Sequence, residues 1–134
     1  MLGLLIEGVA LFIVFSGTAP GAPGVWLAPA AGLLALGILL AYFAVRELGN
    51  EWRIKAVVTE NHRLVRTGPY AFVRHPVYLS LFSMMAGSGL LVCDAGRLLL
   101  ACAIYAVGTE IRVRAEDRLL GARFGAEFEN YRKN

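Results

Sequence analysis

The sequence predicts an all-α integral membrane protein with about four transmembrane helices, a polar cytosolic loop and a C-terminal helix extension. The chain has 134 residues, of which 57% are hydrophobic and 17% are charged. Its mean hydropathy of +0.60 exceeds that of an ordinary soluble domain. The apolar residues also gather in four long runs between polar or glycine-rich segments, as membrane helices do. The length favours one domain covering residues 1–134.

The four apolar runs predict spans at about residues 2–16, 25–45, 77–93 and 97–111. The first run is short for a hydrocarbon core of about 30 Å, because a helix rises about 1.5 Å per residue. No basic segment precedes it, so we expect a membrane helix and not a cleaved signal peptide. A glycine- and proline-rich turn at residues 17–24 leads into the second run, which is the clearest span.

The third and fourth runs are separated by a tight turn at residues 94–96. The helical pattern of the fourth run continues past the membrane to Leu120. Gly121 and Gly125 flank a short amphipathic tail that ends the chain.

The basic residues predict the topology. Of the 13 Lys and Arg residues, six lie in residues 46–76, six lie in residues 112–134, and the last is Arg97. Cytosolic segments of membrane proteins are enriched in Lys and Arg, so both basic segments and both termini are expected in the cytosol. The polar loop and the C-terminal tail can then meet. The charge is explained by topology, and we expect no nucleic-acid partner.

Three residues inside the apolar runs need separate interpretation. Cys93 and Cys102 show no metal-ligand spacing, so we expect small buried hydrophobic residues, with neither a metal nor a disulfide. Glu7 is either a functional carboxylate or a side chain that reaches the nearby interface. A charge at the membrane centre costs about 2.5–3.5 kcal/mol on insertion scales. Because Glu7 is close to the helix end, we expect it to reach the interface.

Residues 61–78 contain both histidines of the chain and two of its five prolines. Pro76 predicts a helix that begins there, because proline is favoured in a first turn. His75 and Tyr78 would lie one turn apart, and Gly68-Pro69-Tyr70 predicts a second tight turn. These residues either form part of a ligand site at the membrane surface or are an ordinary interfacial histidine with tyrosines of the aromatic belt. Composition alone leaves both interpretations open.

The fourth run contributes Arg112 and Glu116, which are four residues apart and share a helix face. They form either an ordinary surface ion pair or part of a site on the same side as His75. The neighbouring charged side chains are expected to be solvated helix surface: Glu110, Arg114, Asp117 and Arg118.

Four motifs occur in order: His62-Arg-Leu-Val65, Thr67-Gly-Pro-Tyr70, Arg74-His-Pro-Val-Tyr78, and Glu116-Asp-Arg-Leu119 with Phe124-Gly-Ala-Glu-Phe-Glu-Asn-Tyr131. Their order and spacing resemble the integral-membrane isoprenylcysteine carboxyl methyltransferase and phospholipid methyltransferase family, over about residues 41 to 131. The family pattern usually has glycine where Ser80 stands and a second glutamate where Asp117 stands. It also continues into a proline-containing tail, whereas the printed sequence ends at Asn134.

The resemblance implies that the loop and the fourth helix bind S-adenosylmethionine (AdoMet), which becomes S-adenosylhomocysteine, without a metal. Arg112 would face and position the substrate. The residues expected to contact the cofactor are His62, Arg63, Leu64, Val65, Tyr70, His75, Pro76, Val77, Tyr78 and Glu116. A carboxylate such as Glu116 suits a ligand that carries an ammonium and a sulfonium.

We therefore expect a cytosol-facing AdoMet-dependent methyltransferase with a lipophilic small-molecule or lipidated acceptor, either an isoprenylcysteine-type carboxylate or a lipid headgroup, in contact with membrane lipids. One alternative is a small four-helix transporter that uses Glu7 as its coupling carboxylate. Another is a degraded homologue that only binds the cofactor.

Overall fold

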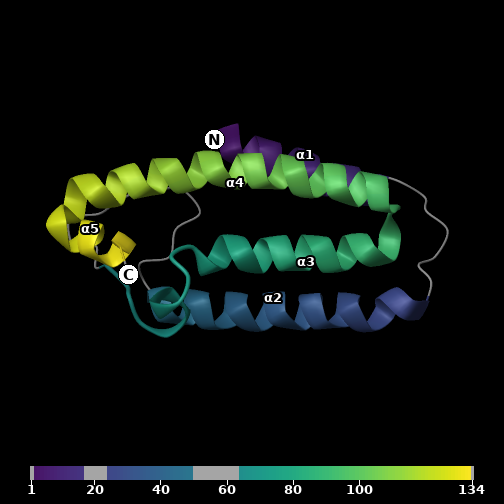
Figure 1. Ribbon diagram of the computed structural model, residues 1–134, viewed down its shortest axis with the longest axis horizontal. Coiled ribbons are helices and arrows are strands. Elements are labelled where there is room, and N and C mark those ends of the chain that lie inside the picture. The colour runs from purple at the N-terminus through teal and green to yellow at the C-terminus, as the bar shows by residue number, and fades with distance from the viewer. Residues whose placement is uncertain (1, 17–23, 50–63, 134) are drawn as a thin grey trace.

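The computed structural model describes residues 2–16, 24–49 and 64–133, and these ranges are helical with short connections. Four helices lie side by side along the long axis of the molecule (Figure 1). A short fifth helix turns back from the end of α4 toward the 3-10 turn η3, and a second 3-10 turn, η1, leads into α2. The bounds are α1 (Leu2–Phe15), η1 (Gly24–Trp26), α2 (Leu27–Leu48), η3 (Gly68–Ala71), α3 (Pro76–Val92), α4 (Ala95–Phe124) and α5 (Ala126–Lys133). The all-α prediction is confirmed for the described residues.

The helices form two closely packed antiparallel pairs, α1 with α4 and α2 with α3. Glycines allow the backbones to approach. A Cβ atom at Gly3 would lie 2.7 Å from the carbonyl oxygen of Gly108, and one at Gly37 would lie 2.8 Å from that of Ser80. Small residues serve this purpose in membrane helices, where van der Waals packing drives association.

The two pairs are joined through contacts of α3 with α4 and α1. The buried residues at this junction come from all three helices: Ala10, Val14, Met85, Ala101 and Tyr105. The Tyr105 hydroxyl donates a hydrogen bond of 3.4 Å to the backbone carbonyl of Tyr78. This contact links the centre of α4 to the first turn of α3.

The outward faces of the bundle are apolar. Phe12, Ile38 and Leu99 are each more than half exposed, and many large exposed apolar side chains are typical of a surface that faces lipid. Among the described helices, one stretch, Gly24–Leu48, is long and apolar enough to cross a membrane. α1 and α3 are shorter apolar helices, so the other three predicted spans stay predictions.

The fourth helix is longer than predicted at both ends. Asp94 caps it by accepting a hydrogen bond of 3.0 Å from the backbone N–H of Arg97, so residues 95–96 belong to the helix and not to a separate turn. Gly121 does not end the helix, which continues to Phe124. The chain turns at Gly125, where φ is +50°, a conformation that glycine adopts at little cost.

The glycine contact between α2 and α3 makes a testable prediction. Gly37→Ala should lower the unfolding temperature of the detergent-solubilised protein, because overpacking typically costs about 1–3 kcal/mol. The matched control is Gly32→Ala on the same helix, where an added Cβ meets nothing within 4 Å. Gly32→Ala should leave that temperature unchanged or raise it. Equal effects of the two substitutions would contradict close α2–α3 packing.

Candidate functional site

The first turn of α3 presents two aromatic rings to α4. Pro76 occupies the first helical turn, and His75 precedes it at the N-cap position. The ring centroids of His75 and Tyr78 lie 5.8 Å apart with an interplanar angle of 30°. The predicted helix start and the one-turn spacing of these residues are confirmed. The predicted turn at Gly68-Pro69-Tyr70 is also confirmed, as η3.

The carboxylate of Glu116 on α4 contacts both of these side chains. The Tyr78 hydroxyl donates a hydrogen bond to Glu116 Oε1, and His75 Nδ1 lies 3.3 Å from Glu116 Oε2. Burial raises the pKa of Glu116, but hydrogen bonds from His75 and Tyr78 and the nearby charges outweigh it. The pKa of Glu116 therefore lies below the ordinary value for glutamate, and the group is anionic at neutral pH.

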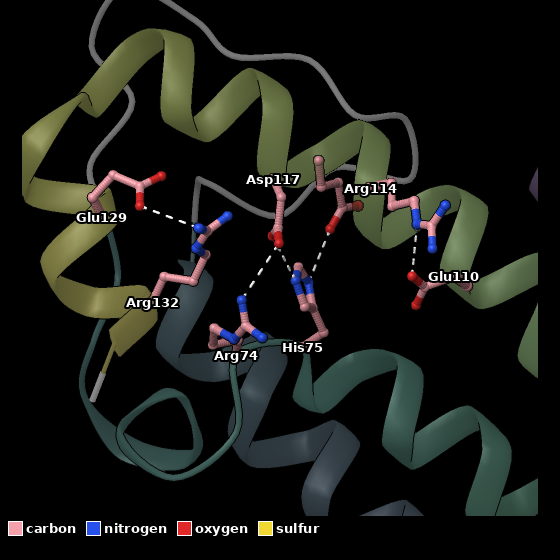
Figure 2. A network of polar contacts seen from close by, with 8 residues as sticks. Arg74, His75, Glu110, Arg114, Asp117, Glu129 and Arg132 are labelled. Atoms are coloured by element: carbon pink, nitrogen blue, oxygen red, sulfur yellow. Dashed lines mark hydrogen bonds and ion pairs between the residues drawn. The ribbon is translucent and has the colours of Figure 1, made fainter.

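Asp117 lies in the same cluster, which corrects the expectation of a solvated side chain. His75 Nε2 lies 3.0 Å from Asp117 Oδ1, and an Arg74 guanidinium nitrogen lies 3.4 Å from Asp117 Oδ2. Figure 2 shows the His75 ring between the loop and α4, with Asp117 on one side. Both ring nitrogens face carboxylate oxygens, and both contacts can be hydrogen bonds when each nitrogen carries a proton.

Arg112 lies one turn before Glu116 and contacts Tyr78. Its guanidinium carbon lies 4.5 Å from the centroid of the Tyr78 ring, within cation–π range. The same guanidinium donates a hydrogen bond of 2.6 Å to Glu7 Oε2 on α1. The face of α4 predicted from the spacing of Arg112 and Glu116 is therefore the face directed at α3.

Glu7, expected to reach the nearby interface, lies buried against α4. It is 5% exposed and accepts hydrogen bonds from Arg112 and, at 3.1 Å, from the Thr109 hydroxyl. These partners could not be identified from the sequence, because they lie 102 and 105 residues after Glu7 in the chain. The one indication in the sequence was Glu7 itself, because a carboxylate within an apolar run needs a polar partner.

The C-terminal helix α5 meets the loop, as predicted for the two basic segments. The Tyr131 hydroxyl donates a hydrogen bond of 2.6 Å to the backbone carbonyl of Tyr70, and Arg66 pairs with Glu127. Phe128 is 2% exposed. Burial raises the pKa of Tyr70, and the charge of Glu116 raises it further. Tyr70 therefore lies within electrostatic reach of Glu116.

The structure brings together four of the predicted site residues: His75, Tyr78, Arg112 and Glu116. Two others, Pro76 and Val77, lie in the same first turn of α3. Leu64 and Val65 are half-buried in irregular chain before η3. His62 and Arg63 lie outside the described residues. Asp117 and Thr109 were not among the predicted site residues, and Glu7 was named only as a candidate functional carboxylate without these partners.

The cluster is suited to a cation. Glu116 and Asp117 supply negative charge beside the ring of Tyr78, and the face of a tyrosine ring attracts cations. Among residues 2–16, 24–49 and 64–133, no group of three or more His, Cys, Asp or Glu side chains is arranged to hold a metal ion. The thiols of Cys93 and Cys102 are free and half-buried.

Comparison with known proteins places these residues in a family context. The model of the isoprenylcysteine carboxyl methyltransferase (ICMT) family matches residues 30–122. The protein-S-isoprenylcysteine O-methyltransferase of Schizosaccharomyces pombe is 31% identical over 111 residues, covering 81% of this chain and 47% of that protein.

Two bacterial relatives show similar identity. The uncharacterized protein YpbQ of Bacillus subtilis is 34% identical over 95 residues, covering 71% of this chain and 56% of the relative. The cobalt-zinc-cadmium resistance protein CzcN of Cupriavidus metallidurans is 30% identical over 109 residues, with coverage of 81% and 48%. No solved structure matches the chain significantly.

The chain spans about half the length of these curated relatives. The matched region nevertheless includes η3, α3 and most of α2 and α4, and therefore the cluster around Glu116. The chain belongs to the isoprenylcysteine carboxyl methyltransferase family.

Proposed function

We propose that this protein is an AdoMet-dependent methyltransferase that modifies a lipophilic acceptor at the cytosolic face of a membrane. One observation carries the proposal: the anionic carboxylate of Glu116 lies beside the stacked rings of His75 and Tyr78, one helical turn from the cation of Arg112. An anionic half and a cationic half side by side can hold a cationic donor and an anionic acceptor together.

The anionic half fits the donor. AdoMet would supply an electrophilic methyl group on its sulfonium. Glu116 would attract the donor's positive charge, and the ring of Tyr78 would contribute cation–π attraction. Tyr70 would form a neighbouring wall, held by its backbone contact with Tyr131. The loop residues His62 to Val65 complete the proposed cofactor contacts.

The cationic half fits the acceptor. Arg112 would orient an anionic group, and a guanidinium suits a carboxylate because it donates in a planar fork. A carboxylate is ionised at neutral pH and attacks without losing a proton, so this half needs no general base. An amine acceptor would need one. The S. pombe relative is named for isoprenylcysteine, and we propose a prenylated-cysteine carboxylate as the acceptor class.

The proposed function also requires a defined position of the helices in the membrane. We propose that residues 1–134 form one domain with spans at about residues 2–16, 25–45, 77–93 and 97–111, and that both termini face the cytosol. An acceptor with a lipid tail would then reach the site from the bilayer. The protein orients the reactants and excludes water, which are the main contributions that a displacement at a methyl group requires.

The first test of this proposal is calorimetric titration of the detergent-solubilised protein with S-adenosylhomocysteine. Glu116→Gln should weaken binding about 10- to 100-fold, because a charge-assisted contact is worth about 1.5–3 kcal/mol. The matched control is Glu110→Gln on the same helix, whose carboxylate pairs with the exposed Arg114 away from the cluster (Figure 2). Glu110→Gln should bind like the parent. Absence of binding to the parent at millimolar ligand would refute the proposal.

Arg112→Gln should impair the reaction with the acceptor and leave cofactor binding nearly unchanged. We expect kcat/KM for N-acetyl-S-farnesylcysteine to fall on the order of 100-fold, because a mispositioned nucleophile reacts slowly. The dissociation constant for S-adenosylhomocysteine should stay within about threefold. Arg114→Gln, two residues along the helix, serves as the control and should change neither quantity. Weakened cofactor binding with unchanged turnover would reverse the proposed roles of Arg112 and Glu116.

The lowered pKa of Glu116 predicts a particular pH dependence. A carboxylate with a lowered pKa contributes fully above the ordinary glutamate range, and its contribution is lost as pH falls through the lowered value. The ratio of dissociation constants for Glu116→Gln and the parent should therefore be constant from about pH 5.5 to about pH 8. A ratio that approaches one by about pH 5.5 would show that Glu116 is not ionised in this range.

A further inference from the structure

We propose that Glu7 is a positioning residue for Arg112, which it holds against the face of Tyr78 so that the guanidinium is directed at the acceptor. The inference rests on the proposed function for the role of Arg112. It adds a residue from α1, which lies before the region that matches the family model, residues 30–122.

The contact is withdrawn from water. The side chains of Arg112 and Glu7 are 17% and 7% exposed, and their nearest atoms lie 2.6 Å apart. By contrast, the pair formed by Arg114 and Glu110 on the same helix is 71% and 57% exposed. Exposed pairs restrain side chains little, whereas a desolvated pair is costly to separate. Glu7 therefore restricts the orientation of Arg112 far more than a surface partner would.

Close packing of α1 on α4 holds the Glu7–Arg112 pair in place. A Cβ at Gly108 would lie 3.0 Å from Glu7 Cγ, and a Cβ at Gly3 would lie 2.5 Å from Arg112 Cγ. Both side chains thus lie directly against the glycine contacts that bring α1 and α4 together. Thr109 donates to the second oxygen of Glu7 at 3.1 Å and fixes the carboxylate plane.

Glu7 also keeps the two halves of the site distinct. Arg112 lies near enough to Glu116 for its charge to lower the pKa of that carboxyl. Without Glu7, the guanidinium would lose the contact that holds it away from Glu116 and would no longer be directed at the acceptor. With Glu7 present, Glu116 can serve the cation. A guanidinium has five N–H donors, so it can hold Glu7 and a second anion together.

The test measures methyl transfer by the full chain to N-acetyl-S-farnesylcysteine, together with binding of S-adenosylhomocysteine. Glu7→Gln should lower kcat/KM for the acceptor about 10- to 100-fold. It should change the dissociation constant of S-adenosylhomocysteine less than about fivefold. Glu7→Asp keeps the charge on a shorter side chain and should restore part of the loss. Glu110→Gln is the matched control. Parent-like acceptor kinetics in folded Glu7→Gln would overturn the proposal.

A double-mutant cycle separates positioning from a merely structural role. If Glu7 acts through Arg112, then Glu7→Gln introduced into Arg112→Gln should change acceptor kcat/KM by less than about twofold. Fully additive losses would show that Glu7 acts independently. If Glu7→Gln does not fold, Thr109→Val removes one hydrogen bond to Glu7 without changing charge. It should lower acceptor kcat/KM about two- to fivefold, and no change would count against the proposal.

A readout without turnover distinguishes failure of this inference from failure of the proposed function. The guanidinium NMR resonance of Arg112, assigned by its loss in Arg112→Gln, should shift or broaden in Glu7→Gln. If the parent binds no S-adenosylhomocysteine and transfers no methyl group but the resonance responds, the proposed function fails and the restraint on Arg112 stands. If methyl transfer occurs but neither the resonance nor acceptor kinetics respond to Glu7→Gln, the inference fails alone.

Discussion

Glu116 on α4 is the carboxylate that joins this helix to the first turn of α3. A carboxylate that is partly withdrawn from water needs hydrogen-bond donors or positive charge, and Tyr78 and His75 provide them from the first turn of α3. Pro76 determines where that turn begins. Separation of α3 from α4 would therefore leave Glu116 without these donors. The same contacts keep Glu116 ionised, which makes it available to a cation.

The glycine contacts between helices position these polar groups. Gly3 and Gly108 allow α1 and α4 to approach so closely that Glu7 meets Arg112 directly. Gly37 likewise allows α2 and α3 to pack closely. Because apolar side chains gain little by leaving lipid for a helix interface, close backbone packing must hold such a bundle together. The polar cluster joins the first turn of α3 to α4, and α4 continues past this end of α3 (Figure 1).

The C-terminal segment completes the arrangement on the side of the loop. After the turn at Gly125, α5 returns toward η3 and buries Phe128. Tyr131 then bonds the backbone of Tyr70, and Arg66 pairs with Glu127. Residues 61 positions apart in the chain are thus in direct contact, and the charge of Glu116 helps to raise the pKa of Tyr70. Polar contacts therefore join α5 to the segment before α3.

Local patterns were sufficient to predict the helices, the start of α3 at Pro76, and the shared face of Arg112 and Glu116. These features depend on hydropathy, backbone restriction and helical spacing, all of which act over a few residues. The partners of Glu7 and Asp117 depended on tertiary structure. Helical spacing shows which side chains share a face, but it does not show which helix lies opposite that face. Only the packing of α1 on α4, and of the loop on α4, decided that Glu7 meets Arg112 and that Asp117 meets His75.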